Sequence, residues 1–285
     1  MFRKADRSHP GSNDPYRRRR ADGVRGPSRT PYGLPAALLA ATLTLGSGAL
    51  HAGDFPEIPF DVAELFFELN NTDGDLGIHA LIDGDAWKKI KIEDLNERTI
   101  LKIRVKGRLQ RQGLTELFFE SAEPTFDELP PARFFNRFPE GFYEIEGKTI
   151  EGEELESEVE LTHVMPAPAK IFVNGVPAAE DCDAVLPVVS PPVTLDWDPV
   201  TLSHPDADGG GAGVQPPVPV TIVNYEVVVE IDETPFRDSI ILPPDQTAYQ
   251  LPGEILALGD EIKFEVLARE ESFNQTAVES CFELE

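Results

Sequence analysis

Basic residues are scarce in this sequence: 25 Lys and Arg stand against 51 Asp and Glu, a formal net charge of −26. Nine of the basic residues and three of the acidic residues precede residue 53, which leaves 16 basic and 48 acidic residues, or −32, in 53–285. A surface with this charge repels nucleic-acid phosphates and anionic lipid head groups. The composition therefore excludes nucleic-acid binding and favours cations, basic partners or solubility in a salty medium.

After residue 52 the chain also lacks an apolar run of about twenty residues, the length that a membrane-spanning helix needs. A shorter apolar run, Leu34–Leu45, follows the basic stretch Arg17–Arg20 and precedes small residues. This order is typical of a secretory signal. We expect residues 1–52 to be a signal peptide with a basic N-terminal arm, cleaved after Ala52 or, as second choice, Ala49. The mature protein is then expected to be periplasmic or secreted, with no membrane span.

Cysteine is limited to Cys182 and Cys281. In an oxidising compartment, two cysteines of one exported domain pair more often than they stay free. The sequence therefore predicts a disulfide between them.

Histidine is also scarce after residue 52. The three that occur there, His79, His163 and His204, do not have the spacing of metal ligands along a helix. A Gly-x-Ser-x-Gly nucleophile motif is absent from the mature part, and Gly209–Gly213 lacks the Lys-Ser/Thr of a phosphate loop. We predict no catalytic residues and no enzymatic activity. A carbohydrate-active accessory or hydrolytic protein stays open as the alternative, because so acidic a chain offers many carboxylate pairs.

Residues 53–165 show a two-residue alternation that is broken by turn residues, which predicts antiparallel strands in a β-meander or sandwich. Turns are expected at Asp73-Gly74, Asp83-Gly84 and Asn96. One or two short helices are expected within 125–138, around Pro130-Pro131. The apolar positions expected to face the core are Leu65, Phe67, Leu69, Leu76, Ile78, Ala80, Ile82, Trp87, Ile90, Ile92, Leu101, Ile103 and Val105.

Residues 166–285 begin with a stiff linker around Pro166 and Pro168 and continue with seven short runs separated by turn signals. This pattern predicts a β-sandwich, so the chain as a whole is expected to be mainly β with two folded domains, 53–165 and 166–285. The expected strands are Ile171–Asn174, Val193–Trp197, Ile222–Ile231, Ser239–Leu242, Ala248–Leu251, Ile262–Ala268 and Thr276–Leu284.

Three of these runs carry a family resemblance. Val193–Trp197, Val223–Ile231 and Ile262–Ala268 resemble the second, third and sixth strands of a fibronectin type III domain, although Phe264 stands where the family usually has Tyr. The resemblance implies an immunoglobulin-like adhesion or spacer module without catalytic residues. It also implies that Cys182 and Cys281 lie at one end of the sandwich, where a bridge would hold the last strand from outside.

The first domain is similar to a family of exported bacterial proteins of uncharacterised function. The similarity rests on Asn70–Gly77, Gly113–Pro124 and Phe138–Tyr143. It implies export and no particular activity, so the expected partner, a protein or a glycan, is unspecified.

The densest group of oxygen ligands is a candidate Ca²⁺ site, because Ca²⁺ takes six to eight oxygen atoms. The helix-loop-helix calcium motif does not fit, since Leu76 and Ile82 replace its Gly and Glu. Plain Asp-Gly hairpin turns are the competing interpretation. The candidate metal ligands are Asn70, Asn71, Asp73, Asp75, Asp83 and Asp85.

Two further features have both a structural and a functional interpretation. Trp87 is expected in the core, and if exposed beside Asp85 it would be a stacking platform for a sugar. Alternate glutamates from Glu154 to Glu160 form either a solvated strand face or a collector of cations.

Overall fold

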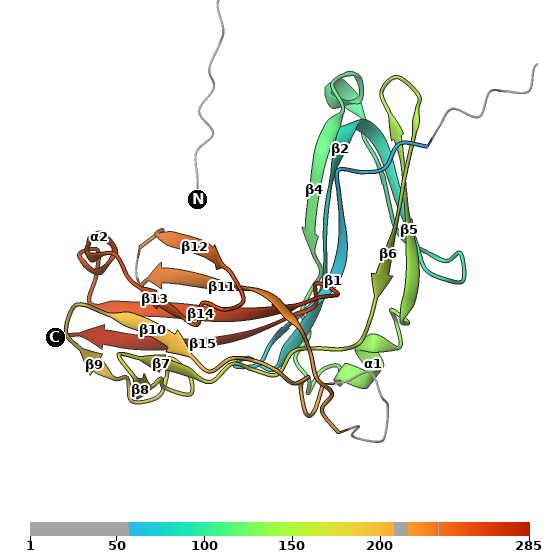
Figure 1. Ribbon diagram of the computed structural model, residues 1–285. Coiled ribbons are helices and arrows are strands. Elements are labelled where there is room, and N and C mark those ends of the chain that lie inside the picture. Colours follow the sequence, from blue (N-terminus) through green and yellow to red (C-terminus); the bar gives the residue numbers. More distant parts are fainter. Residues whose placement is uncertain (1–56, 208–215, 233) are drawn as a thin grey trace, which may run out of the picture. The chain divides into compact units, whose positions relative to one another are not determined.

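The computed structural model describes residues 57–207, 216–232 and 234–285 (Figure 1). The expected signal peptide, residues 1–52, lies outside these residues. Within the described part of the chain the structure is mainly β, and its helices are short. None of those helices has the length and apolar character needed to cross a membrane.

The first half of the described chain is built on six strands. The predicted alternation is confirmed: Phe67 on β1 stands opposite Ile78 on β2, and both side chains are buried in one apolar core. The short helices are η1 (Gly107–Arg111), which the sequence did not predict, and α1 (Pro131–Phe135), which it did. The strands are β1 (Val62–Asn70), β2 (Asp75–Glu93), β3 (Thr99–Arg104), β4 (Leu114–Glu120), β5 (Gly141–Thr149) and β6 (Glu154–Leu161).

The expected turn at Asp83-Gly84 is wrong, because β2 continues through it from Asp75 to Glu93. Asp83 pairs with Val62 on one side and with Glu116 on the other, and the register shifts before Trp87. A glycine inside a strand commonly marks such an irregularity. A Cβ on Gly84 would lie 3.1 Å from the ring of Phe60, so the glycine also makes room for packing.

The second half contains the seven predicted strands and two short ones that were not predicted, β8 and β9. They enclose a separate apolar core in which Trp197 and Tyr225 are in contact. One sheet has the order β13-β10-β7-β8, and the strands β12-β11-β14-β15 of the larger sheet face it across this core. A short helix, α2 (Gly253–Leu256), was not predicted. The strands are β7 (Ile171–Val173), β8 (Val176–Pro177), β9 (Val188–Val189), β10 (Thr194–Trp197), β11 (Ile222–Ile231), β12 (Arg237–Leu242), β13 (Ala248–Gln250), β14 (Glu261–Glu270) and β15 (Gln275–Leu284).

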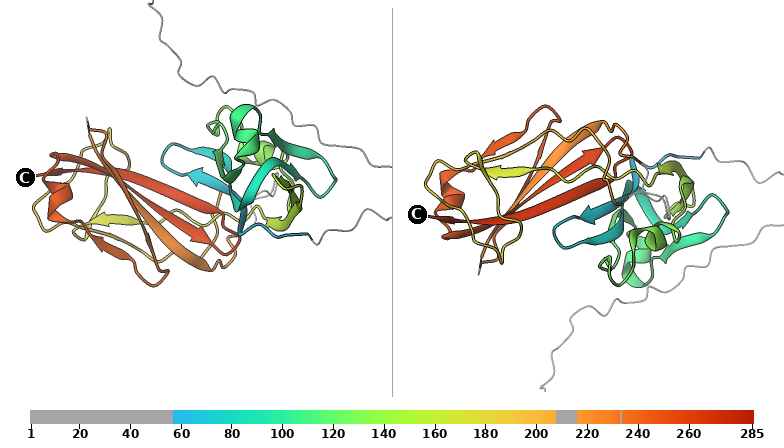
Figure 2. Two further views of the ribbon diagram at one scale, coloured as in Figure 1. Left: turned by 90° about the horizontal axis from the view of Figure 1, so that it is seen from above. Right: turned by 90° about the horizontal axis from the view of Figure 1, so that it is seen from below.

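The two halves share one sheet, which the sequence did not predict. Strand β1 pairs in parallel with β15, with Glu68 beside Gln275 and Asn70 beside Ala277 (Figures 1 and 2). The main path of this eleven-stranded sheet is β12-β11-β14-β15-β1-β2-β5-β6. The fully buried side chain of Asn274 supports the junction: its oxygen accepts the amide N–H of Phe67 at 2.8 Å, and its nitrogen donates to the carbonyl of Val164 at 2.9 Å.

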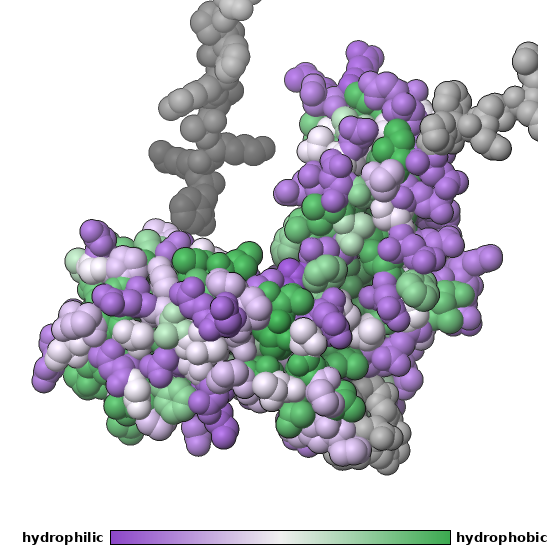
Figure 3. Space-filling model, in the orientation of Figure 1, coloured by the Kyte–Doolittle hydropathy of each residue, from purple (hydrophilic) through white to green (hydrophobic). Residues whose placement is uncertain are grey.

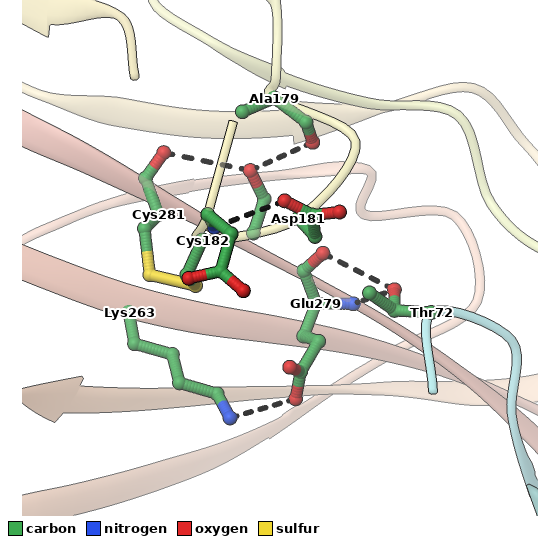
Figure 4. The surroundings of a disulfide bond; sticks show 9 residues. Thr72, Ala179, Asp181, Cys182, Lys263, Glu279 and Cys281 are labelled. Atoms are coloured by element: carbon green, nitrogen blue, oxygen red, sulfur yellow. Dashed lines mark hydrogen bonds and ion pairs between the residues drawn. A yellow bond between two sulfur atoms is a disulfide. The ribbon is translucent and has the colours of Figure 1, made fainter. Parts of the chain in front are cut away.

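The predicted disulfide is present between Cys182 and Cys281 (Figure 4). Cys281 lies on the face of β15 opposite the sandwich core, as expected, yet it is buried at 3% exposure because the loop of Cys182 covers it. The hydroxyl of Ser280 donates to the carbonyl of Ala179 at 2.9 Å, which ties the same loop to β15 a second time.

The surface is predominantly hydrophilic on the face drawn in Figure 3, with hydrophobic residues in smaller patches between the polar ones. Strand β6 lies at the end of the main path of the large sheet, and its glutamates at 154, 156, 158 and 160 are exposed. Charged edge strands disfavour pairing with another chain. The solvated-face interpretation of this glutamate row therefore fits the structure.

Candidate functional site: the acidic cleft at His79

The site lies on the sheet face opposite the first core. Because side chains alternate along a strand, the residues between Leu65, Phe67 and Leu69 on β1 point to this other face. Phe66 on β1 stands opposite His79 on β2. On the other side of β2, His79 stands opposite Glu120 of β4. Pairing of β1 with β15 then adds side chains from the second half to the same face.

His79 is the buried centre of the site, at 3% exposure. Its Nε2 lies 2.9 Å from Oε1 of Glu123, and its Nδ1 lies 3.8 Å from Oε2 of Glu68. The side-chain amide of Gln275 donates to the Glu68 carboxylate and orients it. One imidazole is therefore held between two carboxylates, one from β1 and one from the segment after β4.

Glu123 reaches this position because residue 77 has no side chain. A Cβ on Gly77 would overlap the Glu123 carboxylate. The segment before Glu123 is held by the hydroxyl of Ser121, which accepts the amide N–H of Ile78 at 3.0 Å. The glycine in β2 thus serves the site by opening room for a carboxylate.

A cleft of about 340 Å³ lies beside this group and is lined by its Glu68 and His79. Phe118, 57% exposed, lies at the cleft. Arg269 is paired within the protein. Its Nη2 donates to Oε2 of Glu64 at 2.6 Å, and its guanidinium carbon lies 4.7 Å from the centre of the Phe66 ring. The lining is rich in carboxylates and has contributions from both halves of the chain: Glu64, Phe66, Glu68, His79, Leu81, Phe118, Glu120, Glu226, Val228, Arg237, Glu265, Leu267, Arg269 and Gln275.

The crowding of carboxylates changes their pKa values. Burial raises the pKa of Glu68 above its usual range. Burial lowers the pKa of His79, but the hydrogen bond to Glu123 and the charge of Glu68 outweigh it, so the net shift is upward. Burial, followed by the charges of Glu123, Asp73 and Glu68, raises the pKa of Asp75 to about 6. The site therefore stabilises positive charge and disfavours further negative charge.

Glu265 gives a testable pH dependence. Burial and the charges of Glu68 and Glu279 raise its pKa from 4.5 to about 8, against the weaker opposite effects of Arg237 and Lys263. Between pH 4.5 and 8 the folded state keeps a proton that the unfolded state loses, so rising pH lowers stability. We expect Glu265→Gln, which mimics the protonated acid, to gain about 2–4 kcal/mol over the parent at pH 9 and nothing at pH 4.

Thermal melting from pH 4 to 9 measures this effect. Glu283→Gln, at an exposed position of β15, is the control and should follow the parent curve. Parallel curves for the parent and Glu265→Gln would contradict the raised pKa.

The structure places four of the sequence-predicted metal ligands, Asn70, Asn71, Asp73 and Asp75, in or beside the β1–β2 turn. The oxygen of Asn70 accepts the N–H groups of Thr72 at 2.9 Å and Asp73 at 3.2 Å, so it forms a local side-chain turn. The oxygen of Asn71 lies 3.1 Å from Nε2 of His204. These contacts give both asparagine oxygens a structural role.

The other two predicted ligands are not part of this group. Asp83 and Asp85 lie eight and ten residues along β2 from Asp75, about 27 Å or more at the rise of a strand. The six residues therefore do not converge on one ion. The stacking role considered for Trp87 is also wrong, because its side chain is buried at 0% exposure in the first core.

The group at Glu68, His79 and Glu123 was missed by the sequence analysis. The face alternation of β1 and β2 already placed Glu68 and His79 opposite the core face. No local signal places Glu123 there, since it lies 44 residues beyond His79. The isolated Gly77 inside an apolar strand was the available hint of a close approach by another group.

Comparison with known proteins gives distant structural likenesses. No protein-family model matches the chain. No curated protein matches it. Among solved structures, a 1.5-MDa bacterial ice-binding adhesin aligns with 80% of this chain at 11% identity and a TM-score of 0.24. The FN1–FN3 domains of chicken CNTN1 align with 80% at 8% identity and a TM-score of 0.28.

A segment of two fibronectin type III domains from chicken tenascin aligns with 78% of this chain and 97% of its own length, at 8% identity and a TM-score of 0.25. The chain spans 66% of the adhesin structure and 65% of the CNTN1 structure, slightly under two thirds of each. These are distant matches to fibronectin type III domains and to an adhesin. At such TM-scores they establish neither the fold nor the function of this chain.

Proposed function

We propose that this chain is an exported, non-enzymatic binding protein that holds a positively charged ligand in the cleft at His79. The observation that carries the proposal is the concentration of carboxylates around that cleft, where both halves of the chain contribute to the lining. Its two arginines are engaged, Arg269 with Glu64 and Arg237 with Glu230. The cleft therefore keeps an excess of negative charge for a cationic partner.

Export is supported by the disulfide, because disulfides persist in oxidising compartments such as the periplasm or the extracellular space. The expected signal sequence in residues 1–52 agrees with this location. We assign residues 166–285 to a fibronectin type III-like sandwich, which serves here as a rigid wall of the cleft. Residues 53–165 supply the imidazole and the rest of the lining.

A basic peptide rich in Lys and Arg is a suitable probe of the proposed function. We expect it to bind the chain with an affinity that falls as salt rises, because exposed charge pairs are screened within about 10 Å at 0.1 M salt. The double variant Glu120→Gln/Glu226→Gln removes two cleft charges and should weaken binding about tenfold at low salt, if each is worth about 0.7 kcal/mol.

The matched control is Glu156→Gln/Glu158→Gln on the exposed edge strand β6, which removes the same total charge away from the cleft. Fluorescence anisotropy of the labelled peptide at two salt concentrations measures both variants. Equal weakening in the two variants would show a general charge effect and would overturn the cleft as the site.

A glycan-binding or hydrolytic accessory role remains the second candidate, on two observations. Phe118 is exposed at the cleft and offers an aromatic face to a sugar ring. Glu265 has a pKa of about 8 and is protonated at neutral pH, as a general acid must be. Screens of glycan binding and hydrolysis test this role. Turnover that disappears in Glu265→Gln would replace the non-enzymatic proposal.

A further inference from the structure

We propose that Glu68, His79 and Glu123 form a binding site for a divalent transition-metal ion of the zinc type. This inference rests on the proposed function, because it identifies a metal cation as a ligand bound at the acidic cleft. One ligand atom from each of the three side chains lies within 4.8 Å of the other two. A tetrahedral ion with bonds of about 2.1 Å separates its ligand atoms by about 3.4 Å. An ion on Nε2 of His79 beside Glu123 therefore requires the Glu68 carboxylate, which lies 3.8 Å from Nδ1, to turn toward it.

The chemistry of the donors selects the metal. An imidazole nitrogen with two carboxylate oxygens suits zinc and its first-row neighbours. Calcium prefers an all-oxygen set of six to eight ligands, which His79 cannot join. A metal ion between Glu123 and Nε2 of His79 would replace the hydrogen that these atoms share at 2.9 Å. The acidic cleft therefore favours a different ion from the one that the turn residues suggested.

The surrounding residues prepare the ligands. Gln275 on β15 donates to Glu68, and Gly77 provides the space that Glu123 occupies. Hydrogen bonds of this kind to metal ligands typically contribute tenfold to hundredfold in metal affinity. Since Gln275 belongs to the second half of the chain, the proposed site depends on the pairing of β1 with β15.

A separate observation is consistent with a cation near the group. Oδ1 of Asp75 is buried and has no hydrogen-bond partner among the described residues. Asp75 also experiences the charges of Glu123 and Glu68. A buried carboxylate oxygen without a partner requires an explanation such as an ion or a water. A divalent ion at His79 would offset the charge of this carboxylate together with those of the two glutamates.

A second cluster in the first half provides a contrast. Glu93, Glu144 and Glu146 also lie within 4.8 Å of one another, but Lys91 already pairs with two of them, with Nζ at 2.6 Å from Glu93 and 2.7 Å from Glu146. The cluster contains no histidine. It therefore serves as an internal control for binding to grouped carboxylates.

The experiment measures Zn²⁺ binding to the chain without an affinity tag, by competition with a chromophoric chelator and by calorimetry. We expect one Zn²⁺ site whose affinity falls at least tenfold in Glu123→Gln and further in His79→Ala. Gly77→Ala should also weaken it about tenfold or more, because it displaces Glu123 without removing a ligand. Glu93→Gln should bind like the parent. Circular dichroism checks that each variant is folded.

Nuclear magnetic resonance of the imidazole nitrogens identifies the ligand directly, and it can still be used where a variant is partly destabilised. We expect Zn²⁺ to shift the ring nitrogens of His79 and to leave those of His163 unchanged, and Co²⁺ to give visible absorption bands that Glu123→Gln loses. Equal Zn²⁺ affinity in the parent and Glu123→Gln, or stabilisation by Ca²⁺ but not Zn²⁺, would overturn the proposal. If the parent chain binds the basic peptide but not Zn²⁺, only this inference is wrong. If the parent chain binds neither, the proposed function is wrong as well.

Discussion

Replacement of Asn274 by alanine is expected to lower the free energy of unfolding by about 2–4 kcal/mol, since a buried polar group left without its partner costs about 1–3 kcal/mol. The side chain is fully buried. Its oxygen accepts the amide N–H of Phe67 at 2.8 Å, and its nitrogen donates to the carbonyls of Thr162 at 3.0 Å and Val164 at 2.9 Å. Alanine leaves all three backbone groups without this partner.

Two further variants show whether hydrogen bonding is the cause. Asn274→Asp keeps the volume but points an oxygen at the carbonyls of Thr162 and Val164, so it should be at least as damaging as alanine. Asn96→Ala, in an exposed turn, should change stability by less than about 0.5 kcal/mol. Denaturant unfolding measures the three variants. A loss below 1 kcal/mol in both Asn274 variants would contradict the role of this residue at the junction.

Removal of the disulfide in Cys182→Ala/Cys281→Ala is expected to destabilise the chain by about 3–5 kcal/mol. The two cysteines are 99 residues apart, and closing a loop of that length restricts the unfolded chain by about 4–5 kcal/mol in the entropic model. Loss of the sulfur from the buried Cys281 adds a smaller packing cost. Because Ser280 and Ala179 still hold the loop, we expect the variant to fold.

Chemical reduction separates the bond from the side chains. Dithiothreitol should lower the melting temperature of the parent to near that of the double variant and should leave the variant unchanged. Free-thiol titration confirms the state of the cysteines in each sample. A parent that is insensitive to complete reduction would show that the bond adds no stability.

The local pattern of the sequence was sufficient for most of the strands, and the cysteine count together with the expected oxidising compartment was sufficient for the disulfide. The alternation at Leu65, Phe67 and Leu69 reflects burial of one strand face, which is a property of neighbouring residues, and the structure confirms it. The pattern failed at Asp83-Gly84, where the same two residues that favour a hairpin turn instead accommodate Phe60 inside a continuous strand. Local turn chemistry was overridden there by packing against a more distant segment.

The candidate site could be predicted only in part because its members are distant in the sequence. Glu68 and His79 come from one hairpin, whose register follows from the hydrophobic alternation. Glu123 and Gln275 enter through contacts with segments 44 and 207 residues away from their partners. Hydrophobic alternation within one segment does not predict such contacts. The parallel pairing of β1 with β15 also cannot be predicted from a turn motif, because no short turn connects the two strands.

That pairing also sets an order of events during synthesis. Strand β1 is among the first described elements to leave the ribosome, but its neighbour β15 is the last. Until residues 275–284 emerge, β1 and β14 each have an unpaired edge. The amide N–H of Phe67 likewise has no acceptor until Asn274 has been synthesised. Contacts so far apart in sequence form late and slowly. Strand β15 therefore adds its side chains to the second core, and completes the junction with β1, only after every other described strand has been synthesised.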